Sequence, residues 1–445
     1  MPVSAALSGL NQIATLLSQE ALVTFAEDGR PRPWLAEGWT SSPDNLSLTI
    51  KLRPEAKFHD GSAVTAEPVA AILHRTLPRT MGPAYDDIER IEPMTDNAVA
   101  VRLRRPSPFL VEALETLINK PGTADGGTGP YRPTSTSGSA VDMKAFDAHY
   151  LGRPVIDEVR FQPYPSIRAA WAEMLRGNVD WLFEVGVDAL DSLKTATNVS
   201  VFSFVRNYQY LVMFGSKMNK SSAVRRALNA GINREMLVTR ALNGYGVPSY
   251  GPVSPRHWAV RPSTPTLTFD PEIAGELVHS KLRFTCLVPA DSVYERVALE
   301  LKRQLAEVSV DLILEEASQE RLSQSFNDGD FETLLADPIS GPTLFRSYLF
   351  WHSHGTRHTP GTGNPGMDAA LDRIRHAASD DEYRTGVEAF QRATVENPPA
   401  IFLAWSERAR AVSRRFTVPA EPGRDILPTI QFWRPVTDQR YASRN

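Results

Sequence analysis

Residues 282–315 read LRFTCLVPADSVYERVALELKRQLAEVSVDLILE, and this stretch decides the fold class. The apolar run Leu282–Val288 is typical of a buried strand, and Asp311–Glu315 follows as a second strand. Between the two strands, apolar residues recur at helical spacing, at Val293, Val297, Leu301 and Leu305. A strand, a helix and a strand in this order form a parallel pair with a right-handed crossover. The sequence therefore predicts a mixed α/β fold.

Upstream of this unit, the pattern indicates strands and capped helices. Alternating polar and apolar residues at Ser47–Leu52 and Ala98–Leu103 are typical of half-buried strands. Between them, Thr65 is expected to cap a helix over residues 66–77 that stops before Pro78. The first 23 residues are expected to contain a helix, because apolar residues recur at Leu7, Leu10, Ala14 and Leu17.

Further elements are marked along the second half of the chain. Short strands are predicted over Asn178–Phe183 and Ala400–Trp405, and a helix over Ser222–Ala230. Three helix starts carry capping residues: Asn233, Asp270 with Pro271, and the capping box of Ser379 with Glu382.

The composition is that of an ordinary globular chain of 445 residues, which suggests about three domains. There are 48 Lys plus Arg and 52 Asp plus Glu, so the net charge of −4 points to no nucleic-acid partner. The one cysteine, Cys286, excludes an intramolecular disulfide. No run of about 18 apolar residues is present to span a membrane. The N-terminus lacks the basic start and the unbroken apolar run of an export signal, so the protein is cytosolic or this sequence starts after the signal.

A search for catalytic and cofactor motifs finds none of the nucleophile-elbow, zinc-protease, paired-cysteine or Walker patterns, so we predict no enzyme and no cofactor. Gly126–Gly129 lacks the lysine of a phosphate loop, and Pro130 removes an amide donor, so a plain turn is expected. The best metal candidates are His352, His354 and His358. Their loop contains no carboxylate, so we favour solvated histidines and assign no metal site.

Aromatic residues near predicted strand ends and loops suggest a cleft for an organic ligand. They are Tyr208, Tyr210, Trp258, Phe345, Tyr348, Trp351 and Trp405. Taken singly, each of them also fits a place in the core. Asp337 follows the apolar run Leu334–Ala336, where its carboxylate either pairs with a ligand ammonium or caps the next turn. As ligand-binding residues we select Asp337, Tyr208, Tyr210, Phe345, Trp351 and Trp405.

Several motifs resemble one protein family. They are PWLAEGW (33–39), LRP (52–54), KFHDG (57–61), VTA (64–66), GTGPY (127–131), YLGRP (150–154), GNVD (177–180), VRRALN (224–229) and INRE (232–235). This order resembles the extracytoplasmic solute-binding proteins of family 5, which include the dipeptide-, oligopeptide- and nickel-binding components of ABC importers. The resemblance covers about residues 22–416.

The resemblance implies a two-lobe fold like that of class II, cluster C periplasmic binding proteins, with an extra inserted domain. Lobe I would comprise 1–23, 129–205 and 405–445, the extra domain inserted in lobe I would comprise 24–128, and lobe II would comprise 206–404. Ala336-Asp337 looks like the family's Ala-Asp step, which holds a peptide's ammonium, although Pro338 stands where an aromatic residue is usual. The resemblance places His59-Asp60-Gly61 in the framework of the inserted domain, without a binding role.

The function implied is the capture of a small solute, a di- or oligopeptide above all, and its delivery to the permease subunits of an ABC importer. The protein would be a monomer, periplasmic or otherwise extracytoplasmic, either free or lipid-anchored. Two alternatives stay open. One is a nickel- or metal-chelate-binding protein of the same fold, and the other is a cytosolic ligand-sensing module.

Overall fold

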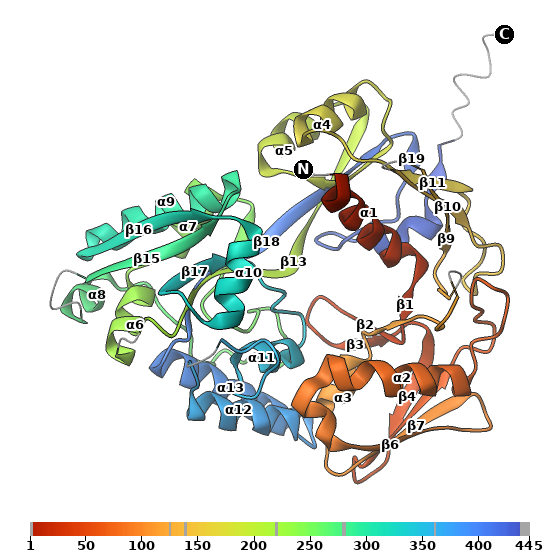
Figure 1. The fold of residues 1–445 in the computed structure, drawn as a ribbon, viewed down its shortest axis with the longest axis horizontal. Coiled ribbons are helices and arrows are strands. Elements are labelled where there is room, and N and C mark those ends of the chain that lie inside the picture. The colour runs from red at the N-terminus through yellow and green to blue at the C-terminus, as the bar shows by residue number, and fades with distance from the viewer. Residues whose placement is uncertain are drawn as a thin grey trace.

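The computed structural model describes residues 3–123, 126–137, 140–218, 221–277, 282–359 and 362–436. Two long antiparallel strands, β13 (Val199–Phe214) and β18 (Ala400–Ser413), cross the centre of the molecule, and three groups of elements surround them (Figure 1). Residues 437–445, which we assigned to lobe I, lie outside the described part of the chain.

The central sheet extends from these strands into the group on the left of Figure 1. Its order is β12 (Trp181–Val185), β18, β13, β17 (Thr333–Ala336), β15 (Leu282–Pro289) and β16 (Val310–Ala317), with β14 (Gly246–Pro248) paired to β18. The predicted strand–helix–strand unit is confirmed, because β15 and β16 are parallel and α9 (Ser292–Glu307) connects them. α9 buries Val297, Leu301 and Leu305 against the sheet. The other helices of this group are α6 (Ser222–Ala230), α7 (Arg234–Ala241), α8 (Pro271–Leu277) and α10 (Gln319–Asp328).

The group at the lower right of Figure 1 is built on a four-stranded antiparallel sheet. The order of this sheet is β4 (Ala36–Ser41), β5 (Ser47–Leu52), β7 (Ala98–Leu103) and β6 (Ile88–Pro93). It packs against α2 (Ala66–Met81) and lies near α3 (Pro108–Ala113) and the 3₁₀ helix η1 (Gly82–Asp87). Short strand pairs complete the group: β2 (Val23–Phe25) with β3 (Pro31–Pro33), and β1 (Glu20–Ala21) with β8 (Leu117–Ile118).

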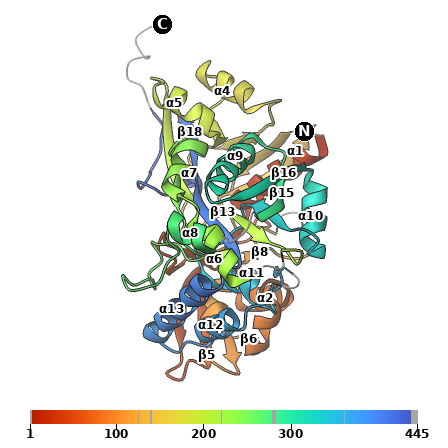
Figure 2. The same ribbon diagram turned by 90° about the vertical axis from the view of Figure 1, so that its left-hand side faces the viewer.

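This lower group shares one hydrophobic core with α11 (Leu344–Trp351), α12 (Pro365–Arg375) and α13 (Asp380–Glu396), which lie beside it at the bottom of Figure 1 and Figure 2. The ring of Phe109 contacts those of Phe345 and Tyr348, at centroid distances of 5.8 and 5.5 Å. Nearby, the buried Glu112 accepts hydrogen bonds from the Phe345 amide (2.8 Å) and the Tyr383 hydroxyl (2.7 Å). Residues 22–118 are therefore packed firmly against these helices.

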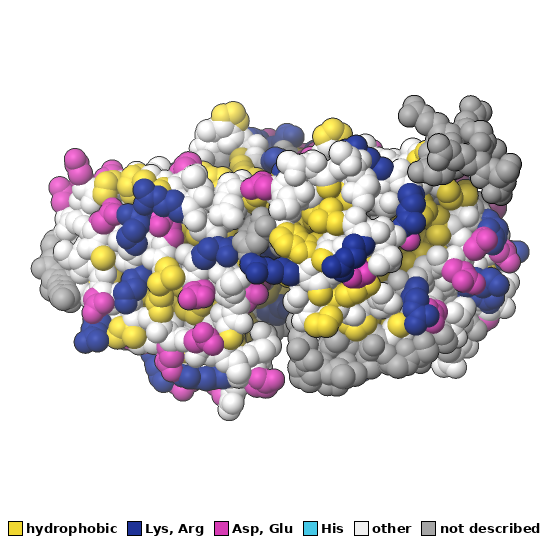
Figure 3. Space-filling model, turned by 90° about the horizontal axis from the view of Figure 1, so that it is seen from above, with side chains coloured by type: hydrophobic (Ala, Val, Ile, Leu, Met, Phe, Trp, Pro, Cys, Tyr) yellow, Lys and Arg dark blue, Asp and Glu magenta, His cyan; other side chains and the backbone are white. Residues whose placement is uncertain are grey.

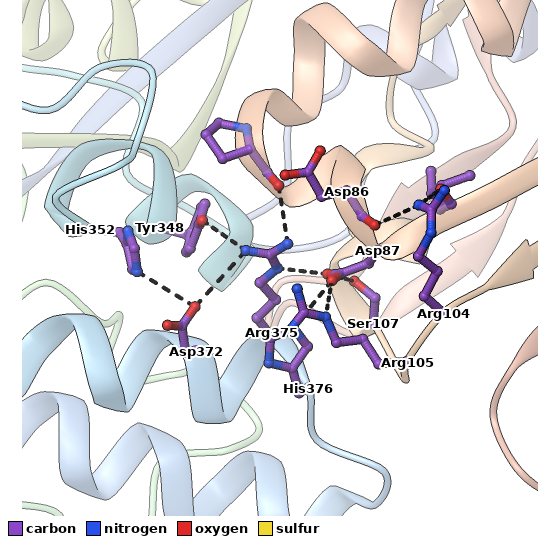
Figure 4. Close-up of polar contacts among 12 residues, drawn as sticks. Asp86, Asp87, Arg104, Arg105, Ser107, Tyr348, His352, Asp372, Arg375 and His376 are labelled. Carbon is purple, nitrogen blue, oxygen red and sulfur yellow. Dashed lines mark hydrogen bonds and ion pairs between the residues drawn. The ribbon is translucent and has the colours of Figure 1, made fainter.

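A buried ionic network crosses the same boundary (Figure 4). The Asp87 carboxylate, whose side chain is 0% exposed, accepts hydrogen bonds from Arg375 Nε (2.6 Å) and Arg105 Nε (2.7 Å). It also accepts from the Ser107 hydroxyl (3.1 Å) and lies 3.2 Å from His376 Nε2. Burial alone would raise the pKa of Asp87, but the hydrogen bonds from His376 and Arg375 lower this pKa to about 2. Asp87 is therefore an ionised carboxylate that joins the two parts of the core.

The group at the upper right of Figure 1 holds the N-terminal helix α1 (Val3–Ser18). α1 buries Ala14 and Leu17, as its periodicity predicts, against the sheet of β9 (Tyr131–Ser137), β10 (Ala140–Ala145) and β11 (Glu158–Phe161). The remaining elements here are α4 (Ile167–Leu175), α5 (Val187–Lys194), β19 (Phe416–Thr417), η2 (Leu427–Phe432) and β20 (Arg434–Pro435).

Two predicted motifs take structural roles where this group meets the lower one. The Gly127 carbonyl accepts a hydrogen bond from the His59 amide (2.8 Å), and the Gly129 amide donates to the Ser18 carbonyl (3.0 Å). His59 Nε2 lies 2.9 Å from the Gly129 carbonyl oxygen, and Asp60 pairs with Lys120 Nζ at 2.5 Å. A methyl group at Gly127 would lie 2.0 Å from the Ser18 carbonyl oxygen, so glycine is required for this close approach.

Four local predictions need correction. α2 continues through Pro78 to Met81, because Leu77 and Met81 are fully buried on its inner face, and Thr65 makes no capping hydrogen bond. The strand expected at 178–183 is β12, which covers Trp181–Val185. The strand expected to end at Trp405 continues to Ser413, because β13 pairs with it along almost its whole length. The other helices and strands named from the sequence are confirmed.

No helix in the described ranges is long and apolar enough to cross a membrane. On the face seen from above, basic and acidic side chains are interspersed among apolar patches (Figure 3). Neither sign of charge dominates this face.

Candidate functional site

A cleft of about 1780 Å³ lies beside the middle of β13 and β18. One wall comes from the upper-right group, through α1, residues 163–167 and η2. The opposite side comes from residues 23–27, 254–257 and 339–342. The two long strands supply its floor, with residues 204–208 from β13 and Trp405, Arg408 and Arg410 from β18. Elements from distant parts of the sequence therefore meet at this one site.

A bulge in β13 shapes the cleft floor. Val205 pairs with Glu407 and Gln209 pairs with Trp405, so residues 206–208 stand opposite one residue of β18. The Asn207 carbonyl accepts hydrogen bonds from the amides of Ser340 (2.8 Å) and Gly341 (3.1 Å). A bulge bends its strand and redirects side chains, and this one turns residues 206–208 away from β18 toward the cleft.

Arginines that are paired with carboxylates line the floor of the cleft. Arg408 Nε donates to Glu184 Oε1 (2.8 Å), and Arg408 Nη2 donates to the Tyr210 hydroxyl (2.8 Å). Arg410 forms a two-pronged pair with Asp425. Side chains that are paired in this way hold fixed positions, so the floor presents an ordered set of charges to a bound molecule.

The wall on the α1 side is apolar and solvent-exposed. Leu16 is 51% exposed, Ile167 58% and Phe432 45%, and all three line the cleft. Exposed apolar side chains gathered in a concave site favour a ligand with apolar surface of its own.

Asp337 lies close to this site, after the end of β17. Its carboxylate accepts a short hydrogen bond from the Tyr294 hydroxyl, and its neighbour Ile339, two residues on, lines the cleft. Burial raises the pKa of Asp337, against the lowering effect of the Tyr294 hydroxyl and of Arg206 and Arg408. Asp337 itself is not among the residues that line the cleft, so its predicted contact with an ammonium group stays a prediction.

The structure separates the aromatic residues selected from the sequence. Tyr208 and Trp405 line the cleft, and Trp405 Nε1 is buried without a hydrogen-bond partner in the described structure. Tyr210 instead faces α9, where its ring contacts that of Tyr294 edge to face at 5.6 Å.

Phe345 and Trp351 also lie away from the cleft, together with Tyr348. The sequence suggested loops here, but residues 344–351 form α11, whose apolar side chains are buried on every side. Trp351 packs on Phe402 at a centroid distance of 5.6 Å. A short helix whose apolar side chains are all buried belongs to a core, so Phe345, Tyr348 and Trp351 pack the protein interior.

The three candidate metal ligands differ in their burial. His352 is buried, which corrects the expectation of a solvated side chain; its Nδ1 accepts a hydrogen bond from the His354 amide (3.0 Å), and its Nε2 lies 3.5 Å from Asp372. His354 is exposed, and His358 is half-buried, with its pKa lowered by burial. Among the described residues, no group of three histidines, cysteines or carboxylates is placed to hold a metal ion.

Sequence reasoning missed the charged residues of the floor: Arg206, Arg408, Arg410 and Glu184. A usable signal was present, since polar and charged residues from Ser406 to Arg410 follow the apolar run Ala400–Trp405, and Arg206-Asn207 interrupt another strand. The pattern alone does not place the two interruptions side by side, because about 200 residues separate them along the chain.

Residues 30–359 match the family described as "Bacterial extracellular solute-binding proteins, family 5 Middle". Among curated proteins, the chain is 23% identical over 429 residues to the probable D,D-dipeptide-binding periplasmic protein DdpA of Escherichia coli (strain K12). That alignment covers 87% of this chain and 83% of DdpA.

Two solved structures share the fold. NikZ from Campylobacter jejuni, in complex with Ni(L-His), superposes with a TM-score of 0.81 at 21% identity, over 94% of each chain. The oligopeptide-binding protein AppA from Bacillus subtilis, in complex with a nonapeptide, gives a TM-score of 0.78 at 19% identity, over 96% of this chain and 94% of AppA. These matches confirm the predicted mixed α/β fold class.

Proposed function

The chain belongs to family 5 of the bacterial extracellular solute-binding proteins, and on that premise we propose that its cleft captures a di- or oligopeptide. It is a non-enzymatic solute-binding component of an ABC importer. The proposal concerns the class of solute and the residues that hold it.

One observation carries the choice of a peptide, namely the size and the mixed lining of the cleft. At about 1780 Å³ it exceeds the 300–1,000 Å³ typical of a pocket for one small molecule. It joins an apolar wall to a floor with arginines and carboxylates, and a peptide carries apolar side chains together with an ammonium and a carboxylate. The relatives DdpA and AppA, named for peptide binding, support the same choice.

The mechanism we propose is closure of two lobes about β13 and β18, with lobe I as residues 1–23, 129–205 and 405–445 and lobe II as 206–404. The bulge at 206–208 lies where both strands pass between the lobes and is the expected hinge. Contacts that a solute makes with both walls exist only in the closed form, so binding shifts the equilibrium toward closure. The resemblance assigns the inserted domain to lobe I. Because residues 22–118 share a core with α11–α13, we propose instead that this domain moves with lobe II.

The proposal is tested by identifying the molecule that the protein binds. Mass spectrometry of the purified protein under native conditions should show a retained peptide. Calorimetry of the emptied protein should show saturable heat with a mixture of di- to pentapeptides and none with Ni(II)-histidine. Saturation by the nickel chelate alone would replace a peptide by a metal chelate as the solute.

The role of Asp337 is tested separately. Replacement Asp337→Ala should weaken peptide binding at least tenfold, because it removes the carboxylate expected to hold the ammonium. Asp330→Ala is the matched control, since Asp330 forms an exposed pair with Lys217 (2.5 Å) and does not line the cleft. Equal affinity of the Asp337→Ala variant and the wild-type protein would reject the assigned role.

A further inference from the structure

Five arginines line the cleft in the described part of the chain, and four of them are held by carboxylates at hydrogen-bonding distance. Arg408 pairs with Glu184 at 2.8 Å and Arg424 with Glu421 at 2.5 Å. The other two form similarly close pairs, Arg256 with Glu27 and Arg410 with Asp425. Their N–H groups are largely committed within the protein.

Arg206 differs from these four. Its nearest carboxylate oxygen is Glu184 Oε1, at 3.9 Å, and that oxygen already accepts a hydrogen bond from Arg408. Among the contacts of the described residues, the Arg206 guanidinium donates no hydrogen bond. A guanidinium has five N–H donors, so Arg206 brings nearly all of its donors unused into the cleft.

The bulge and Tyr208 fix where these donors lie. The Arg206 guanidinium carbon is 3.8 Å from the centre of the Tyr208 ring, a stacking distance. Stacking occupies the flat face of a guanidinium and leaves its edge free for a two-pronged hydrogen bond. The Arg206 side chain is 24% exposed, so it is partly desolvated and still reachable by a ligand.

The ligand that matches this arrangement is a carboxylate. Its two oxygens accept two parallel N–H bonds from one guanidinium, and charge-assisted bonds of this kind are stronger than neutral ones. The acidic side chains of Glu184 and Asp337 lie nearby and repel any anion. This repulsion is weaker for a carboxylate, which carries one negative charge, than for a more highly charged phosphate.

We propose that Arg206, backed by Tyr208, binds a carboxylate of the solute at the cleft floor. The inference rests on the proposed function and adds to it the group that is recognised, the free C-terminal carboxylate of the peptide. Amidation of the peptide removes that charge and leaves the rest of the molecule unchanged. It is therefore the matched probe for this contact.

The test is a double-mutant cycle by calorimetry, with the tightest-binding peptide of the di- to pentapeptide mixture and its C-terminal amide. On the wild-type protein, amidation should weaken binding at least tenfold. The Arg206→Gln variant should bind the peptide acid at least tenfold more weakly than the wild-type protein does. On this variant, the amide should bind less than twofold more weakly than the acid. Arg206→Lys keeps the positive charge but lacks the two-pronged donor geometry of a guanidinium, so it should recover part of the lost affinity for the acid.

Arg321→Gln is the control, because Arg321 forms a surface pair with Glu315 (2.7 Å) outside the cleft, and it should behave as the wild-type protein. An equal cost of amidation in the wild-type protein and in Arg206→Gln would overturn the proposal. Comparing acid with amide within each variant separates this result from a general loss of folding.

The outcome also separates this inference from the proposed function. If no peptide of the di- to pentapeptide mixture binds the wild-type protein, the peptide assignment fails. Glutarate and glutaramide are then titrated into the same two proteins. Binding of glutarate that depends on Arg206 would keep the carboxylate contact, and binding of neither compound, or binding independent of Arg206, would reject it.

Discussion

The replacement Asp87→Ala should destabilise the protein strongly, because it breaks a buried ion pair from one side. Asp87 is fully buried and Arg375 is 7% exposed, so the variant leaves a guanidinium in the core without its carboxylate. Arg375 would keep two neutral acceptors at hydrogen-bonding distance, the Tyr348 hydroxyl (3.0 Å) and the Pro83 carbonyl (3.1 Å), and its remaining carboxylate, Asp372, lies farther away at 3.9 Å. Removing one partner of a buried pair costs about 3–5 kcal/mol.

A matched control lies on the same boundary. Arg30 and Asp380 pair at 2.6 Å, but their side chains are 40% and 56% exposed. A pair exposed to that extent contributes about 0–1 kcal/mol, so Asp380→Ala should change the stability little. The two variants should therefore differ by about 2 kcal/mol or more.

The assay is urea denaturation of the whole chain at pH 7, followed by far-UV circular dichroism, with the free energy of unfolding taken from the midpoint and slope. The reasoning is refuted if Asp87→Ala loses no more stability than Asp380→Ala. The pKa of Asp87 is lowered in the folded state, so its contribution is present above pH 3.8 and is lost as the pH falls toward about 2. The difference between wild-type protein and Asp87→Ala should shrink over that same range.

Two further predictions concern single groups. Burial raises the pKa of Glu112 from 4.5 to about 7, so the folded state holds a proton that the unfolded state releases, and stability should fall as the pH rises from about 4.5 to 7. Glu112→Gln should lack this fall in urea titrations at pH 5 and pH 8, and an unchanged pH dependence would contradict it. Gly129→Ala should cost about 1–3 kcal/mol in urea denaturation, since its methyl group would lie 2.4 Å from the Leu17 carbonyl oxygen. Gly38→Ala, with open space around it, should cost far less; equal losses would refute the argument.

Local patterns were sufficient for the elements whose partners lie close in sequence. β15, α9 and β16 follow one another within about 35 residues, and hydrophobic spacing identifies each of them and their parallel pairing. Helix starts at Asn233, Asp270 and Ser379 were also readable, because a capping side chain bonds an amide only two or three residues away.

Propensity misled where long-range packing outweighed it. Pro78 signals the end of a helix, yet α2 continues to Met81 because burial of Leu77 and Met81 compensates for the lost backbone hydrogen bond. Phe345 and Trp351 suggested a binding cleft as isolated aromatic residues. Their burial in α11 depends on a core shared with residues 22–118, which no local pattern reveals.

The amino-acid sequence by itself determined the fold class, most helix starts and the family, since these depend on short-range periodicity and on ordered motifs. The tertiary structure alone decided which residues line the cleft that we propose as the binding site. The bulge at residues 206–208 exists because β13 pairs with a strand about 200 residues away and has two residues more than its partner at that point. That mismatch places Arg206 and Tyr208 on the cleft floor, and it is a property of the pairing of the two strands, not of either strand alone.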